Sequence, residues 1–130
     1  MNGKVAYWLK LCDEDLLTAK ALLDSERFLH MGLFCHMIVE KGLKAVIADK
    51  TNEMPPKIHD LEKLAVIGGM YDHLTEGQRT LLQKLIPLQI EARYSEYSEE
   101  ITSTLTIAYC SQLLGETEAF LCWIKNQLEN

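Results

Sequence analysis

Two clusters of polar side chains in the sequence could carry chemistry. Glu40 and Lys44 are spaced i and i+4, so on a helix they can form an ion pair worth about 0.3 kcal/mol. The imidazole of His59, which precedes Asp60, could titrate near neutral pH and hydrogen-bond a phosphate or a carboxylate. Each pair also has a plain structural interpretation. Glu40 and Lys44 would lie on a solvated helix face, and Asp60 would cap a helix against which His59 packs.

A third segment places Arg93 beside Tyr94. The guanidinium carries a fixed fork of donors that suits a phosphate, and the neighbouring ring could stack on a base. Arg93 could equally hold an internal carboxylate such as Glu40 or Asp60, and the residues alone leave these two interpretations equal. If the ligand is anionic, five cations could concentrate positive charge around it: Lys41, Lys44, Lys57, Lys63 and Arg93.

The motifs of familiar metal and catalytic sites are missing from the sequence. A di-iron centre in a helical bundle needs Glu-x-x-His, but the residues three before the four histidines are Arg27, Leu33, Pro56 and Met70. The sequence also contains no H-E-x-x-H, G-x-S-x-G, Walker or G-x-G-x-x-G motif. We therefore expect no metal, no cofactor and no catalytic residue. This favours a non-catalytic role and leaves open whether the protein is an enzyme.

The four cysteines are far apart and form no C-x-x-C pair. Each falls on or beside an apolar face of a candidate helix, where cysteine behaves as a small hydrophobic residue. The sequence therefore predicts reduced core thiols at Cys12, Cys35, Cys110 and Cys122.

Length and composition indicate one soluble domain that spans residues 1–130, with 48% hydrophobic and 25% charged residues. Charged residues interrupt every apolar run, so we expect no membrane span. The formal charge of −6 argues against strong nucleic-acid binding, which needs clustered Lys and Arg. The first residues lack the apolar core of a secretory signal, so we expect a cytoplasmic protein.

Apolar residues recur every three or four positions over residues 5–23 and 28–49, which predicts two helices. The prolines at 55 and 56 stop any continuation. A short third helix is predicted to begin at Asp60, which would cap it, and to end at Gly68 and Gly69.

A fourth helix is predicted to begin at Thr75, because Thr75 and Gln78 have the spacing of a capping box. Pro87 falls inside its apolar pattern, so we expect a kink or a shift in hydrogen bonding there. The segment through Ile90 and Arg93 would then be angled or separate.

The last apolar pattern runs over residues 98–128 and predicts one long helix. Unbroken, that helix would measure about 45 Å at roughly 1.5 Å per residue, against about 35 Å for a globule of this size. A homodimer partner would cover the excess, and a bend at Gly115 is an equal alternative. The expected fold is all-α: an antiparallel, up-and-down bundle of four to five helices with a long C-terminal helix.

Three motifs, taken in order and with their gaps, resemble the HEPN domain family. They are Glu40-Lys41-Gly42-Leu43-Lys44-Ala45, His59-Asp60-Leu61-Glu62-Lys63-Leu64 and Ala92-Arg93-Tyr94. The resemblance covers about residues 5 to 125. It implies a bundle of four or five helices, usually a homodimer, related to the C-terminal domain of kanamycin nucleotidyltransferase.

The resemblance also implies a role in nucleotide binding, often beside a nucleotidyltransferase encoded by a neighbouring gene. On this basis Arg93 would meet the phosphate, Tyr94 would pack on the base or the core, and His59 would line the pocket together with Asp60 and Lys44. Glu40 would pair with Lys44.

The sequence departs from the family at the ribonuclease motif, in which four to six residues lie between an Arg and the His that follows it. Arg27 is followed by His30, which is too near, and His36, which is too far, while Arg79 and Arg93 have no downstream His in range. The Arg-Tyr-Pro of the family is also Arg-Tyr-Ser here. The non-ribonuclease branch of the family fits this pattern better.

Two functions follow from the resemblance. The first is a non-catalytic nucleotide-binding module that works as a homodimer. The alternative is a protein-interaction subunit of a two-gene nucleotidyltransferase/HEPN system that resembles a toxin–antitoxin pair. The acidic charge, the overlong last helix and the lack of a catalytic signature favour this alternative.

Overall fold

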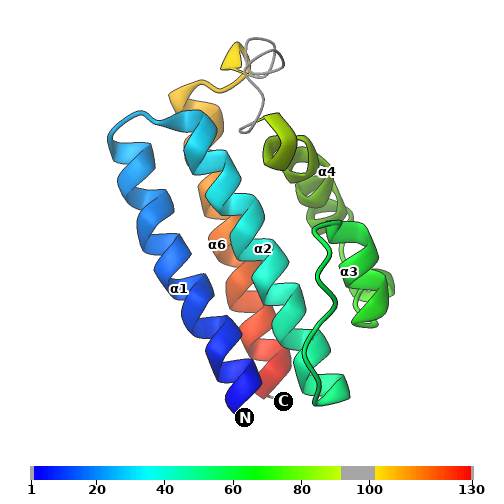
Figure 1. Ribbon diagram of the computed structural model, residues 1–130. Coiled ribbons are helices and arrows are strands. Elements are labelled where there is room, and N and C mark those ends of the chain that lie inside the picture. Colours follow the sequence, from blue (N-terminus) through cyan, green and yellow to red (C-terminus); the bar gives the residue numbers. More distant parts are fainter. Residues whose placement is uncertain (1, 92–101, 130) are drawn as a thin grey trace.

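In the part of the chain that the structure describes, four long helices form a bundle, with two short helical segments between the second and third of them (Figure 1). The computed structural model describes residues 2–91 and 102–129. The helices in this part of the chain are α1 (Gly3–Asp24), α2 (Phe28–Thr51), α3 (Leu61–Ile67), the 3-10 helix η1 (Tyr71–His73), α4 (Glu76–Glu91) and α6 (Ile107–Glu129).

The long helices alternate in direction. In Figure 1, α1 and α4 run upward, α2 and α6 run downward, and both ends of the chain lie at the lower end. No strand occurs in residues 2–91 or 102–129. The predicted all-α, antiparallel, up-and-down bundle is therefore confirmed.

The first two helices form a hairpin. α1 begins at Gly3, two residues before the apolar pattern, because the Asn2 side chain accepts a hydrogen bond from the Val5 backbone N–H and caps the helix. The chain reverses at Glu26, which has a left-handed backbone with φ of 59°. The Arg27 N–H then donates to the Leu22 carbonyl, 2.8 Å away, and α2 begins.

α2 is the central helix and packs against α1, α3, α4 and α6. Gly32 lets α4 approach it closely, because a Cβ atom there would come within 2.9 Å of a Leu88 methyl group. A Cβ atom at Gly42 would lie 3.8 Å from Ile124 on α6, which is an ordinary van der Waals contact. Because α2 is buried on most sides, polar side chains along it are held in the interior.

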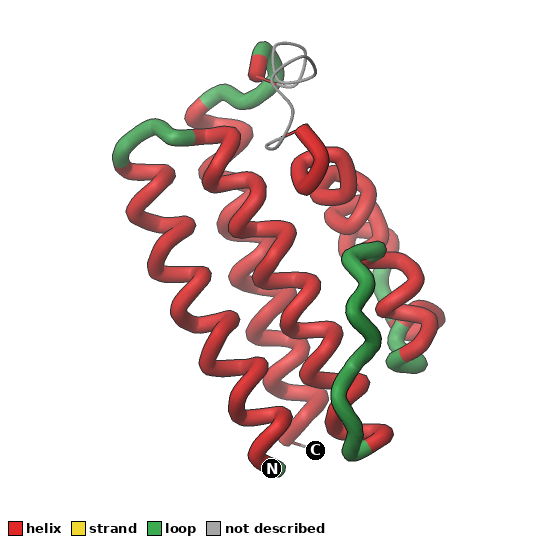
Figure 2. The backbone as a smooth tube through the Cα atoms, in the orientation of Figure 1, coloured by secondary structure: helices red, strands yellow, loops and turns green. Residues whose placement is uncertain are grey.

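The segment after α2 carries His59 back along the bundle. α2 ends where Asn52 adopts a left-handed conformation with φ of 56°. The chain then runs back towards α3 through the two prolines, as Figure 2 shows. As predicted, Asp60 caps α3: its Oδ1 accepts a hydrogen bond from the Lys63 N–H at 3.1 Å.

The predicted capping box at the start of α4 is confirmed. The Gln78 N–H donates to the Thr75 hydroxyl at 3.1 Å, and the Thr75 N–H donates to the Gln78 side chain at 2.9 Å. The expectation that the segment after Pro87 could be a separate helix is wrong, because α4 continues through Pro87 to Glu91. Leu88, buried against Gly32, ties the end of α4 to α2 and offsets the bond that proline removes.

The predicted start of the last helix is wrong. α6 begins at Ile107 and not near Ser98, because the Thr106 hydroxyl accepts from the Tyr109 N–H at 3.1 Å and caps the helix. Its 23 residues span about 35 Å at 1.5 Å per residue, and the helix continues through Gly115. α6 therefore matches the width of the bundle, and the reason for expecting a partner over its end disappears.

Among the described residues, no helix combines the length and apolar character that crossing a membrane would require.

Candidate functional site

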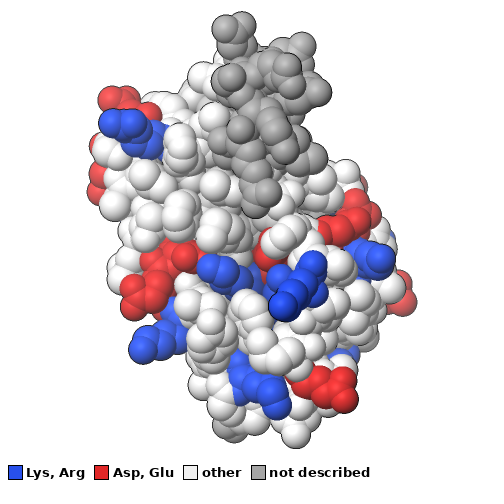
Figure 3. Space-filling view, viewed as in Figure 1, with Lys and Arg blue, Asp and Glu red and all other residues white. Residues whose placement is uncertain are grey.

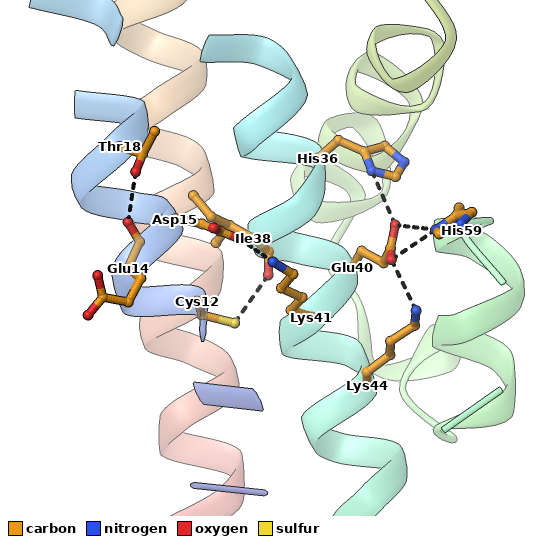
Figure 4. Close-up of polar contacts among 10 residues, drawn as sticks. All are labelled: Cys12, Glu14, Asp15, Thr18, His36, Ile38, Glu40, Lys41, Lys44 and His59. Atoms are coloured by element: carbon orange, nitrogen blue, oxygen red, sulfur yellow. Dashed lines mark hydrogen bonds and ion pairs between the residues drawn. The ribbon is translucent and has the colours of Figure 1, made fainter. Parts of the chain in front are cut away.

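The carboxylate of Glu40 is the centre of a four-residue polar cluster (Figure 4). Glu40 is only 7% exposed. His59 Nδ1 lies 3.1 Å from Oε1 and 3.0 Å from Oε2, and Lys44 Nζ donates to Oε2 at 3.0 Å. His36 Nδ1 approaches Oε1 to 3.6 Å. We call Glu40, Lys44, His36 and His59 the Glu40 cluster.

Helix geometry and one loop assemble this cluster. His36, Glu40 and Lys44 follow each other at steps of four residues, so they lie on one face of α2. His59 arrives from the segment before α3, 19 residues beyond Glu40. The sequence predicted the Glu40–Lys44 pair. The sequence also carries a signal for His36, which has the same spacing of four from Glu40.

Lys44 lies in the interior, not on the solvated helix face that was one interpretation. It is 6% exposed, and its ammonium group lies 5.6 Å from the centre of the Trp8 ring on α1. A buried ammonium needs compensation, which the Glu40 carboxylate and the face of the indole ring supply together. Lys44 thus fixes the carboxylate from below and is turned away from solvent.

His59 is the part of the Glu40 cluster that meets solvent. Its side chain is 54% exposed, against 9% for that of Glu40. An ionised carboxylate only accepts hydrogen bonds, so Nδ1 must carry a proton when it bonds to Glu40. The other ring nitrogen, Nε2, is then the acceptor of the neutral imidazole, and it becomes a donor when the ring is protonated. The arrangement can present either a base or a cation to a ligand.

The remaining predicted site residues have different positions. Asp60 follows His59 and uses Oδ1 to cap α3, as its structural interpretation predicted. Arg93 and Tyr94 lie outside the described residues. The nucleotide contacts expected of all five residues stay predictions.

A second charged group links α2 to α1. Lys41 Nζ donates to Asp15 Oδ2 at 2.6 Å, and both side chains are less than one-fifth exposed. Lys41 and Lys44 are therefore both held in ion pairs with carboxylates. Lys41 and Lys44 therefore do not add free positive charge to the group of five cations that the sequence predicted around an anionic ligand. Figure 3 shows acidic and basic side chains intermixed on the face it presents.

Three of the cysteines are buried, as expected, but Cys122 is exposed. Position 122 lies beside the apolar face of α6, whose inward positions are taken by Leu121 and Ile124. Burial raises the pKa of the Cys12 thiol to about 12, with the nearby Asp15 carboxylate as a secondary cause. Burial likewise raises the pKa of Cys35 to about 12. These thiols stay protonated at neutral pH and are poor nucleophiles.

Among the described residues, no three His, Cys, Asp or Glu side chains gather in a way that could hold a metal ion. The Glu40 cluster has two imidazoles but one carboxylate, whose two oxygens already meet Lys44 and His59. Its arrangement suits orientation of an imidazole better than ligation of a cation.

Comparison with known proteins agrees with the resemblance in the sequence. A family model described as HEPN domain matches residues 5–127. Searches of curated proteins and of solved structures found no match. The family model covers nearly the whole chain, including α1, α2, α3 and α4 and the Glu40 cluster that they hold. The protein therefore belongs to the HEPN domain family.

Proposed function

We propose that the protein is a non-catalytic nucleotide-binding module that works as a homodimer, with His59 at the entrance of the nucleotide site. One observation carries this proposal: the exposed imidazole of His59 is fixed by a buried carboxylate, which is itself fixed by a buried lysine. A surface histidine with only a structural role does not need this two-layer support.

The proposed division of roles follows from burial. Lys44 and Glu40 are 6% and 7% exposed, so we assign them to positioning His59, in place of the direct nucleotide contact expected of Lys44. Protonated His59 would donate from Nε2 to a phosphate oxygen. Arg93 would add a bidentate contact to the phosphate, and Tyr94 would pack on the base. Asp60, next to His59, keeps one carboxylate oxygen beyond its cap bond to accept from a ligand hydroxyl.

The positions of the histidines near Arg27 support the non-ribonuclease assignment. His36 is 1% exposed and lies against Glu40, so it cannot reach an RNA phosphate. His30 is exposed but follows Arg27 by only three residues. Neither supplies the histidine of the family's ribonuclease motif.

Calorimetric titration with AMP, ATP and GTP tests the proposal. We expect saturable binding of at least one nucleotide, and loss of that binding in His59→Ala and in Arg93→Ala. His30→Ala, which changes an exposed histidine elsewhere on α2, is the matched control and should bind as the parent does. Equal affinity in His59→Ala and the parent, or no binding of any nucleotide, would contradict the proposal.

A second proposal is the protein-interaction subunit of a nucleotidyltransferase/HEPN pair. Val66 and Ile67 are adjacent at the end of α3 and expose 61% and 44% of their surface, so together they offer a small apolar contact surface for a partner. Co-expression with a nucleotidyltransferase from an adjacent gene should give a complex on size exclusion, and Val66→Asp should weaken it. Separate elution of the two products would reject this proposal.

A further inference from the structure

We propose that the protein has a second small-molecule site, at the end of the bundle where α2 and α6 finish, and that this site takes a compact zwitterion with an aromatic ring, as in an aromatic amino acid. A cavity of about 410 Å³ opens there. Its lining includes Asp49, Lys50, Gly69, His73, Trp123 and Gln127. The volume falls within the range of small-molecule pockets, about 300–1,000 Å³.

The polar side chains of this cavity have no partner of their own in the described part of the chain. Asp49, Lys50, His73 and Gln127 line it, and none of their side chains makes a hydrogen bond or an ion pair there. This contrasts with the Glu40 cluster, where every charged group is paired with another. All four side chains are exposed and therefore hydrated, so a ligand in the cavity would take the place of water on these donors and acceptors.

Asp49 and Lys50 define the charge pattern of the ligand. They are successive residues on α2 and point about 100° apart, so they cannot pair with each other across the helix surface. Both nevertheless line one cavity. A ligand that carries one cation and one anion would satisfy both, with its ammonium near Asp49 and its carboxylate near Lys50. A ligand with a single charge would satisfy only one of them.

The backbone around the cavity adds to this preference. α2 and α6 both end beside it, and the carbonyl ends of helices carry a partial negative charge that favours a ligand ammonium. Gly69, with φ of 70°, leaves room for Lys50: a Cβ atom at that position would lie only 2.6 Å from the Lys50 ammonium nitrogen. The lysine side chain is therefore laid across Gly69 at the cavity wall.

Trp123 supplies the surface for an aromatic ring. Its indole is half-buried and already packs against Phe120, with ring centres 5.7 Å apart, so it is held in place from behind. Indole faces stack on aromatic rings and also attract cations. A ring on Trp123, with an amino-acid head group directed to Asp49 and Lys50, would use all the distinctive features of the cavity.

The proposed cavity site is independent of the nucleotide site. Asp49 lies nine residues beyond Glu40 on α2, which is about 13 Å along the helix axis. No member of the Glu40 cluster lines the cavity. Loss of binding at one site would therefore leave the other intact.

Calorimetric titration of the full chain with L-tryptophan and L-phenylalanine tests this proposal. We expect saturable binding of at least one of the two. Tryptamine, which lacks the carboxylate, and indole-3-acetate, which lacks the ammonium, should bind about tenfold more weakly, because each loses one charge contact. No saturable binding of either amino acid would overturn the proposal, as would an affinity for tryptamine or indole-3-acetate equal to that for L-tryptophan.

Three variants locate the site. Lys50→Ala and Trp123→Leu should each weaken amino-acid binding about tenfold or more. Lys10→Ala, which changes an exposed lysine on α1, and His59→Ala should leave it unchanged. Thermal melting of each variant confirms that it is folded. Parent-like affinity in folded Lys50→Ala would overturn the assignment, as would AMP binding that depends on Lys50.

Discussion

Glu40 and Lys41 are neighbours on α2, yet they take part in two different ion-pair arrangements. Lys41 belongs to a bridge between two helices, and Glu40 belongs to the Glu40 cluster. Lys41 reaches across to Asp15 on α1 and forms a simple bridge of two partly buried side chains. Glu40 faces the other way, towards α3, and binds a buried lysine and an exposed histidine together. The Asp15–Lys41 bridge joins two helices, whereas the Glu40 cluster extends from the interior to the surface.

The difference lies in where each network ends. The Asp15–Lys41 bridge is complete, because each charge has its partner and neither side chain is more than one-fifth exposed. In the Glu40 cluster the buried charges leave one ring nitrogen of an exposed imidazole facing outward. A charged cluster becomes a candidate site when buried groups hold an exposed one in position, and burial of charge alone does not suffice.

Removal of the Glu40 carboxylate should have the largest effect on stability. In Glu40→Ala the Lys44 ammonium would stay buried without its carboxylate, which costs about 3–5 kcal/mol of unfolding free energy. Urea unfolding measures this loss. The double variant Glu40→Leu/Lys44→Met should recover much of it, because no unpaired charge remains in the interior. A loss below about 1 kcal/mol in Glu40→Ala would show that the Glu40 cluster is open to water.

Removal of Asp15 should cost less. Lys41 is 18% exposed at its side chain and can turn towards water, so Asp15→Ala should lose about 1–2 kcal/mol, between the values for surface and buried pairs. Lys20→Ala is the matched control, since it breaks an exposed bridge to Glu118. An equal loss in Asp15→Ala and Glu40→Ala would remove the contrast between the two regions.

High pH should lower the unfolding free energy through the buried thiol of Cys12, which lies near the Asp15–Lys41 bridge and is not part of the Glu40 cluster. The folded pKa of Cys12 is about 12 against an ordinary value of 9.0, so the unfolded chain releases this proton first as pH rises. The stability contribution of the Cys12 thiol is therefore complete below pH 9 and falls above it, by up to about 1.4 kcal/mol per pH unit. Unfolding between pH 8 and 10.5 should show a shallower fall in Cys12→Ala. If the unfolding free energy of Cys12→Ala and of the parent protein fell equally with pH, this would contradict the raised pKa of Cys12.

Replacement of His59 should change stability least. Its side chain is more than half exposed, so His59→Ala should stay within about 0.5 kcal/mol of the parent protein. The same variant should lose nucleotide binding. If His59→Ala instead unfolds as readily as Glu40→Ala, the histidine has a packing role and the proposed site loses its main residue.

The sequence predicted features that depend on near neighbours. The caps at Asp60 and Thr75 and the Glu40–Lys44 spacing each involve residues three or four apart, where helix geometry alone decides the contact. The predicted ends of α1 and α2 agree with the structure within two residues for the same reason.

Contacts between distant segments escaped prediction. His59 meets Glu40 because α3 packs on α2, and Lys41 meets Asp15 because α1 packs on the other side. Spacing along the chain does not indicate which lysine faces which carboxylate across two helices. The start of α6 was missed because the apolar pattern continues upstream of Thr106, where a side-chain cap and not hydrophobicity sets the boundary.

Nitrogen-15 NMR of the His59 imidazole during titration with a nucleotide that binds tests the central claim most directly. At a pH where the ring is neutral, the structure predicts the Nδ1–H form, with Nε2 unprotonated, because Nδ1 donates to Glu40. Added nucleotide should shift the Nε2 resonance in the parent protein, with no such shift for His30. A neutral His59 protonated on Nε2, or an unchanged Nε2 resonance at saturating nucleotide, would contradict the account.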